Sequence, residues 1–134
     1  MKIWCDGSNT EYCFLPEDSE PKIFDNPAGC SHNESEYLAV LGALLHLARW
    51  TAPPPFPAEI ISDSQLVVRQ LNGLMKKMGR TYQEPVYEVK DAGMQVLAHV
   101  VEQVLRVTLP YEIKFTWVPR EENRAGKILE RRKV

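Results

Sequence analysis

The chain has 134 residues, of which 44% are hydrophobic and 25% charged, and its net charge is −2. This composition is ordinary for a globular protein, and the length suits one domain over residues 1–134. The longest apolar stretch, 37–50, contains His46 and Arg49 and is too short to span a bilayer. The first residues also lack the apolar core of a signal peptide. We therefore expect a cytoplasmic protein that does not bind membranes.

The cysteines and the distribution of charge narrow the possible functions. Cys5, Cys13 and Cys30 are odd in number and lack Cys-x-x-Cys spacing, which argues against a disulfide framework or a zinc site. Residues 1–36 carry eight acids and two lysines, whereas residues 120–134 carry six bases and three acids. The basic patch could bind a polyanion while the acidic patch binds metal cations. The alternative, that both are only solvated surfaces, stays open on charge alone.

The predicted elements mix strands and helices. Short alternating or apolar runs predict strands, and three- and four-residue apolar spacing predicts helices. Strands are expected at 1–6, 12–17, 21–26, 58–62 and 111–119, and helices at 34–50, 64–71, 82–107 and 121–133. The prolines at 53–57 end the first helix, and Asn72-Gly73 is expected to stop the second. This order describes a mixed sheet in which an antiparallel meander precedes parallel crossovers.

Three acids stand at positions where such a sheet would gather them. Asp6 and Asp63 each follow a strand, and Glu36 lies near the start of the first helix. Oxygen ligands without clustered His or Cys favour Mg²⁺ or Mn²⁺ over Zn²⁺. Each acid also has a structural explanation: a turn for Asp6-Gly7, a capping box for Asn33 and Glu36, and a helix N-cap for Asp63.

Four motifs occur in order along nearly the whole chain. They are "DGS" at 6–8, "SHNESEYLAVLGAL" at 31–44, "SDSQLVVRQLNG" at 62–73 and "WVPREEN" at 117–123. Together they resemble the type 1 ribonuclease H family much more specifically than any one of them does alone. The resemblance implies an α/β, ribonuclease H-like fold, with a mixed five-stranded sheet flanked by helices.

The same resemblance implies an activity. Enzymes of this family cut the RNA strand of an RNA–DNA hybrid with two Mg²⁺ ions, for which Mn²⁺ can substitute. One ion activates water and the other stabilises the leaving 3′ oxygen. By this match Asp6 is a catalytic ligand of both ions, and Glu36 and Asp63 each bind one. Asn33 resembles the residue that meets the 2′-hydroxyl in the minor groove. Further substrate contacts are expected at Gly7, Ser8, Ser64, Gln65 and Lys127.

The chain departs from the family pattern after the last strand. The family continues Asn-x-x-Ala-Asp and so supplies a fourth carboxylate, but Lys127 stands at the expected position of that acid. An inward Lys127 would repel the second ion, whereas an outward one could grip a phosphate. Glu130, Glu121 or Glu122 could replace the missing carboxylate. The first hairpin also lacks the usual glycine-rich stretch.

These departures leave two alternatives to the nuclease function. The chain could be a catalytically weak or inactive hybrid-binding module of a larger assembly, and Lys127 is the feature that separates this function from an active nuclease. It could also be a nuclease for another substrate, such as double-stranded RNA or a DNA junction, because one fold hosts many activities.

Overall fold

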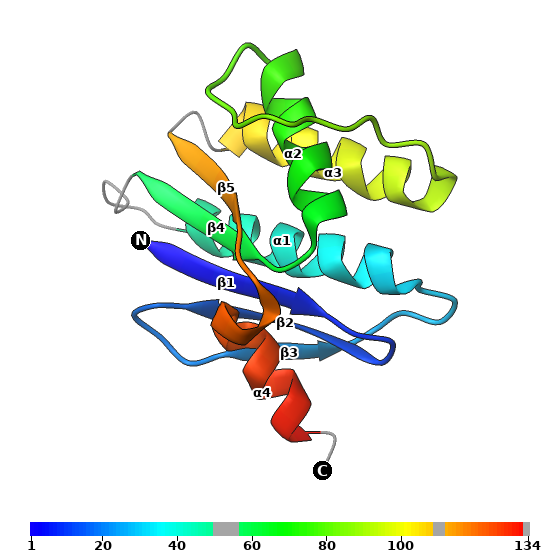
Figure 1. Cartoon of the computed structure of the whole chain (residues 1–134), viewed down its shortest axis with the longest axis vertical. Coiled ribbons are helices and arrows are strands. Elements are labelled where there is room, and N and C mark those ends of the chain that lie inside the picture. Colours follow the sequence, from blue (N-terminus) through cyan, green and yellow to red (C-terminus); the bar gives the residue numbers. More distant parts are fainter. Residues whose placement is uncertain (50–56, 109–111, 133–134) are drawn as a thin grey trace.

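The computed structural model describes residues 1–49, 57–108 and 112–132. The predicted proline-rich connection lies almost wholly outside these residues. The described chain forms five strands, four α-helices and one short 3-10 helix (Figure 1). The strands are β1 (Lys2–Gly7), β2 (Glu11–Pro16), β3 (Lys22–Asp25), β4 (Ala58–Ser62) and β5 (Ile113–Trp117). The helices are α1 (His32–Ala48), α2 (Gln65–Lys77), α3 (Ala92–Thr108), the 3-10 helix η1 (Arg120–Glu122) and α4 (Arg124–Arg132).

The strands form one mixed sheet in the order β3-β2-β1-β4-β5. The first three strands pair antiparallel, and β4 and β5 add in parallel. The expected mixed five-stranded sheet is therefore confirmed. Cys5 and Ser62 form the last pair between β1 and β4. Asp6 and Asp63, which follow Cys5 and Ser62 in the chain, therefore lie at the same end of the sheet.

Both faces of the sheet are covered, and the side chains of successive residues in β1 point to opposite faces. Ile3 and Cys5 belong to the larger apolar core, which α1, α2 and α3 complete. Trp4 belongs to a smaller core that includes Ala125 and Leu129 of α4. Figure 1 shows α4 crossing the face opposite to α1. Asp6 follows this alternation and shares the face of Trp4. Among the described residues, no helix combines the length and apolar character that crossing a membrane requires.

Helix α2 continues past Gly73 to Lys77, so the expectation that it stops at Asn72-Gly73 is wrong. A Cβ at position 73 would lie 2.7 Å from the carbonyl oxygen of Tyr87. Glycine at this position therefore lets segment 80–91 pack closely against α2. It does not end the helix. The backbone N–H of Tyr87 donates to the carbonyl of Arg69 across the same contact.

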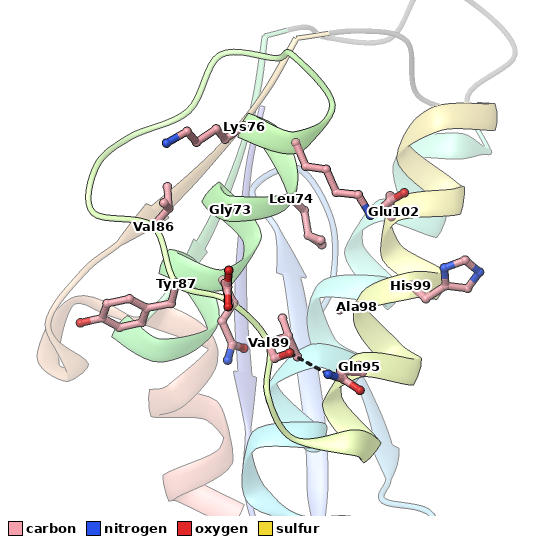
Figure 2. A pocket seen from close by; sticks show the side chains of 13 residues that line it. Gly73, Leu74, Lys76, Val86, Tyr87, Val89, Gln95, Ala98, His99 and Glu102 are labelled. Carbon is pink, nitrogen blue, oxygen red and sulfur yellow. Dashed lines mark hydrogen bonds and ion pairs between the residues drawn. The ribbon is translucent and has the colours of Figure 1, made fainter.

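Helix α3 begins at Ala92, so the expected helix over 82–107 is wrong in its first ten residues. Pro85 lies inside that stretch, and proline disrupts a helix interior because it lacks the N–H donor. The side chain of Asp91 accepts from the N–H of Met94 and provides the start of the helix. Segment 80–91 instead crosses α2 and α3 and walls a cavity of about 920 Å³, into which Val86 and Val89 face (Figure 2).

Candidate metal centre

Asp6, Glu36 and Asp63 lie together at one end of the sheet. Each offers an oxygen within 4.8 Å of the others. Asp6 is fully buried, Glu36 is 2% exposed, and the side chain of Asp63 is 8% exposed. Three acids that are 57 residues apart at the extremes therefore share one poorly hydrated corner of the molecule.

The turn explanation for Asp6 is wrong. Asp6 lies within β1 and pairs with Cys13 of β2. The turn follows later, where the hydroxyl of Ser8 accepts from the N–H groups of Thr10 and Glu11. Asp6 therefore has no part in the turn, and its side chain is free to point into the cluster from the strand.

The capping explanation for Glu36 is also wrong, because the capping box of α1 uses other residues. The hydroxyl of Ser31 accepts from the N–H of Glu34 at 3.1 Å, and Glu34 accepts from the N–H of Ser31 at 3.3 Å. Asn33 and Glu36 thus lie inside the helix, and Glu36 faces β1. Gly7 permits this contact, since a Cβ there would lie 2.4 Å from the backbone nitrogen of Glu36.

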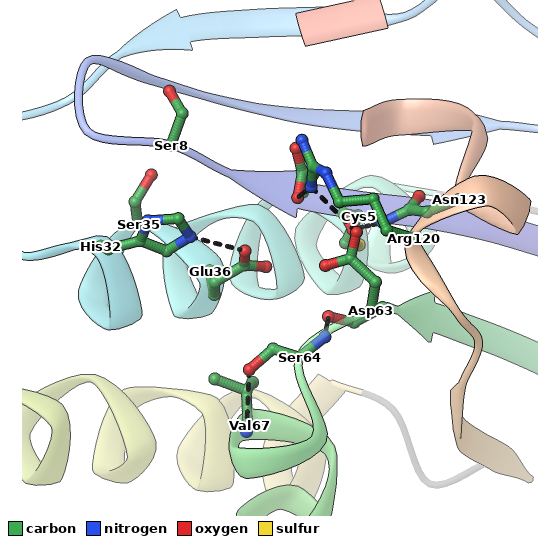
Figure 3. Close-up of polar contacts among 12 residues, drawn as sticks. Cys5, Ser8, His32, Ser35, Glu36, Asp63, Ser64, Val67, Arg120 and Asn123 are labelled. Carbon is green, nitrogen blue, oxygen red and sulfur yellow. Dashed lines mark hydrogen bonds and ion pairs between the residues drawn. The ribbon is translucent and has the colours of Figure 1, made fainter. Parts of the chain in front are cut away.

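The N-cap of α2 is Ser64 rather than Asp63. The Ser64 hydroxyl accepts from the N–H of Val67 at 3.2 Å (Figure 3). Asp63 therefore stands between the end of β4 and the cap of α2, with its carboxylate directed at the cluster. Trp117 of β5 donates its indole N–H to the carbonyl of Asp63 at 3.0 Å and fixes the backbone at this point.

The electrostatics of the cluster are unfavourable to three ionised acids. Burial raises the pKa of Asp6 to about 7, aided by the charges of Glu36 and Asp63 and opposed by Arg120. Burial likewise raises the pKa of Glu36, although a hydrogen bond from His32 lowers it. Among the described residues, Asp6 Oδ2 and Glu36 Oε2 are buried without a hydrogen-bond partner. Such oxygens are expensive to leave unpaired, so the cluster has less positive charge than its three carboxylates would need when ionised.

Two residues that the sequence analysis did not assign contact the cluster. Arg120 places Nη1 at 3.1 Å from Asp6 Oδ1 and 2.9 Å from Asp63 Oδ2. His32 places Nε2 at 3.3 Å from Glu36 Oε1, and this hydrogen bond raises the pKa of His32. Figure 3 shows Arg120 directed toward Asp63, and His32 toward Glu36. The signals were the arginine within "WVPREEN" and the four-residue spacing from His32 to Glu36, which places both on one helix face.

Comparisons with known proteins identify the fold. No protein-family model and no curated protein sequence matches the chain. Among solved structures, LC11-RNase H1 in complex with an RNA/DNA hybrid matches with a TM-score of 0.73 and 21% identity, over 96% of this chain and 91% of that one. A structure of LC11-RNase H1 described as isolated from compost by a metagenomic approach matches with a TM-score of 0.68 and 22% identity, over 95% and 90% of the two chains. The N-terminal RNase H domain of a Mycobacterium tuberculosis protein, fused to maltose binding protein, matches with a TM-score of 0.64 and 21% identity, over 96% and 93%.

The chain has the ribonuclease H fold. The fold that the four motifs predicted is therefore confirmed over nearly the whole length of the chain. At these identities the likeness establishes the fold, and the function has to be inferred from the site.

Within the ribonuclease H fold, the residue that faces the cluster from α4 is Gly126. A Cβ there would lie 3.3 Å from Arg120 Nη1 and 3.5 Å from Asp63 Oδ2. Lys127, expected at this position, is one residue too late and is exposed. Glu130 does not supply the missing carboxylate either, because it accepts from Arg120 Nε at 3.0 Å and is 54% exposed. Glu121 and Glu122 are exposed on η1.

The start of α4 explains this shift of one residue. The buried side chain of Asn123 donates to the carbonyl of Cys5 at 2.9 Å and accepts from the N–H of Ala125 at 3.2 Å. The expected helix over 121–133 is thus interrupted, with η1 before Asn123 and α4 after it. Asn123 ties the first turn of α4 to β1 beside Asp6, and so it decides which residue of α4 faces the cluster.

The remaining predicted residues lie around the cluster. Asn33 is half-buried in the first turn of α1, and Gln65 is exposed at the first position of α2. Gly7 and Ser8 are buried, and Ser64 is occupied as a cap. Their contacts with a substrate, and those of Lys127, stay predictions.

The donor set fits a hard divalent cation. All three acids offer oxygen, and no His or Cys completes the group within the described residues. The two buried oxygens without a partner give such a cation atoms to bind. Mg²⁺ and Mn²⁺ prefer this ligand type, and a bound ion would offset the burial and the like-charge repulsion that together raise the pKa of Asp6.

Proposed function

We propose that the chain is a metal-dependent endoribonuclease that cuts the RNA strand of RNA–DNA hybrids, and that residues 1–134 form its single domain. The observation that supports this most strongly is the cluster of Asp6, Glu36 and Asp63 on a ribonuclease H fold, with two buried carboxylate oxygens left without a partner. The hybrid bound by one structure of the same fold supports the choice of substrate.

The three carboxylates are the proposed catalytic ligands of Mg²⁺, with Mn²⁺ as a substitute. Divalent ions held there would activate the attacking water and stabilise the leaving 3′ oxygen. Asp6 is central because it is the most buried of the three and its carboxylate contacts Arg120 of η1. His32 holds Oε1 of Glu36 by its hydrogen bond and so orients the carboxylate, leaving Oε2 available.

The residues around the cluster are the proposed substrate contacts. Asn33 offers an amide that can meet a 2′-hydroxyl, which distinguishes RNA from DNA. Lys127 is exposed on α4 and can bind a phosphate of the hybrid. Ser64 and Gln65 border the cluster at the start of α2. Gly7 and Ser8 act indirectly, because they are buried and shape the end of β1.

A substrate panel tests this function. End-labelled RNA–DNA hybrid, RNA duplex and DNA duplex are each incubated with Mg²⁺, Mn²⁺ or EDTA, alongside the Asp63→Asn variant as a matched control. We expect cleavage of the RNA strand of the hybrid only, in either metal, by the wild type and not by the variant. Equal cleavage by Asp63→Asn, or cleavage in EDTA, would contradict the metal role, and cleavage of another duplex would contradict the substrate.

The second candidate, an inactive hybrid-binding module, is favoured by one observation. The guanidinium of Arg120 already neutralises part of the cluster. Lys127, which was expected to separate the two functions, is exposed on α4. A gel-shift assay in Ca²⁺ measures hybrid binding separately. Hybrid binding without any cleavage in Mg²⁺ or Mn²⁺ would favour this candidate.

A further inference from the structure

We infer that Arg120 takes the place of one of the two cations expected in this centre, so that the chain binds a single divalent ion beside a resident guanidinium. This inference rests on the proposed function, because it takes the three carboxylates to be the ligands of a divalent ion. It concerns the number of ions and the group that replaces the second one.

The contacts of the cluster divide it into two sides. One nitrogen of Arg120 is shared between Asp6 Oδ1 and Asp63 Oδ2, at 3.1 and 2.9 Å. A cation bridging these two carboxylates through the same two oxygens would have to displace that nitrogen. The buried oxygens that have no partner among the described residues belong to Asp6 and Glu36 instead. The guanidinium therefore occupies the side between Asp6 and Asp63, and the side between Asp6 and Glu36 holds the buried oxygens that an ion could bind.

The charge of the cluster also supports a single divalent ion beside Arg120. Ionised, Asp6, Glu36 and Asp63 carry three negative charges, which one divalent ion and one guanidinium balance. A second divalent ion beside Arg120 would leave an excess of two positive charges in a corner where the acids are shielded from water. Like charges at such short range repel each other, so the arginine and a second ion compete for this side of the cluster.

Two neighbours hold Arg120 in this position. Glu130 of α4 accepts from Nε at 3.0 Å, on the far side of the guanidinium from the cluster. Gly126 leaves the space that the guanidinium occupies, since even a Cβ there would come within 3.3 Å of Nη1. The absence of a side chain at position 126 and the arginine at position 120 therefore belong together. The guanidinium of Arg120 thus supplies a positive charge that belongs to the chain. A carboxylate at position 126 would instead have needed a bound metal ion to balance it.

Counting bound Mn²⁺ tests the inference without any measurement of activity. Free Mn²⁺ is followed by electron paramagnetic resonance while the full chain is titrated near neutral pH, and bound ions per chain are obtained by difference. We expect one ion for the wild type and two for Arg120→Gln. Arg120→Lys, which keeps the positive charge, should bind one, and so should the matched control Arg131→Gln, which removes an exposed charge from the end of α4.

The wild-type count is decisive even if Arg120→Gln fails to fold, a point that circular dichroism checks. Two ions on the wild type would overturn the inference. Cleavage of the hybrid measured on the same preparation then separates the two claims, because two ions with cleavage would leave the proposed function standing. No bound ion on the wild type would overturn both. A single ion on a folded Arg120→Gln would also overturn the inference, since the arginine would then not be what excludes the second.

Discussion

Two buried carboxylates in this molecule have opposite surroundings. Glu102 of α3, which is 7% exposed, receives Lys77 on one oxygen and Arg106 on the other, each at 3.0 Å. Burial would raise the pKa of Glu102, but these two hydrogen-bonded bases outweigh it and lower the pKa. Asp6 shares a single arginine with a second acid, and burial raises its pKa to about 7.

This difference in surroundings indicates that Glu102 belongs to a structural ion pair, whereas Asp6 belongs to a binding site. At Glu102 the bases outnumber the acid and both carboxylate oxygens are hydrogen-bonded, so this group joins α2 to α3 and needs no ligand. Glu102 also lines the cavity formed with Gly73, Val86 and Val89 (Figure 2). Its charge there is already balanced by Lys77 and Arg106. At Asp6 the acids outnumber the base, and one buried oxygen each of Asp6 and Glu36 has no hydrogen-bond partner in the described part of the chain. Only this second arrangement calls for a cation.

Asp6→Asn should have the largest effect. We expect hybrid cleavage to fall by at least about 1000-fold, because the central ligand is lost. In EDTA near pH 8 the free energy of unfolding should rise, since the variant removes the repulsion between buried acids. Urea unfolding and a cleavage time course measure the two effects. A variant that is both active and destabilised would show that Asp6 is a structural residue like Glu102.

Glu36→Gln should abolish cleavage while leaving helix α1 stable, because the capping box uses Ser31 and Glu34. Gln keeps the size of the side chain but is a much poorer ligand for a hard cation. Ser31→Ala is the matched variant and should do the reverse, with a loss of about 1 kcal/mol of stability and normal cleavage. Thermal unfolding and cleavage of both variants decide the matter. If Glu36→Gln stays active and only its melting temperature changes, Glu36 is not a ligand.

The pH dependence of stability should carry opposite signs for the two carboxylates. Between about pH 4 and about pH 7, Asp6 is protonated in the folded protein and ionised in the unfolded chain, so its contribution falls as pH rises. The lowered pKa of Glu102 means that its contribution grows as pH rises toward its ordinary value. Urea unfolding in EDTA over this range should therefore show that the stability of Asp6→Asn falls less, or rises more, with pH than that of the wild type. Parallel curves would contradict the raised pKa of Asp6.

Glu102→Gln should have the smallest effect. Lys77 and Arg106 are largely or partly exposed, so water screens the pair, and we expect a loss of about 1 kcal/mol of stability near neutral pH. Cleavage of the hybrid should not change. A gain in stability, measured by urea unfolding, would remove the contrast with Asp6.

The fold could be predicted further than the site. The strand at 58–62 was predicted with its observed bounds, because a short apolar run between a proline stretch and an acid is a strong local signal. Gly73 was misinterpreted, because its reason is the tertiary approach of Tyr87, which no local pattern shows. The start of α1 differs, because Ser31 and Glu34 fit the local capping-box pattern at least as well as Asn33 and Glu36 do, and the structure uses Ser31 as the cap.

The error at α4 has a physical cause in the geometry of the helix. A helix turns by about 100° per residue, so an error of one residue in its phase moves a side chain to another face. Asn123 sets the phase of α4 through its contact with β1, and this contact brings Gly126 rather than Lys127 to the cluster. Arg120 was missed for a related reason, because the course of η1 directs it toward Asp6 across 114 residues of sequence.

The most direct test of the account is the stabilisation of the folded chain by Mg²⁺. Urea unfolding near pH 8 is compared in EDTA and in increasing Mg²⁺ for the wild type, Asp6→Asn and Glu102→Gln. A ligand that binds only the folded state adds about 2.7 kcal/mol at 100 times its dissociation constant. We expect this gain for the wild type and for Glu102→Gln, and almost none for Asp6→Asn. An equal gain for all three, or none for the wild type, would contradict the claim that this cluster is a divalent-cation site.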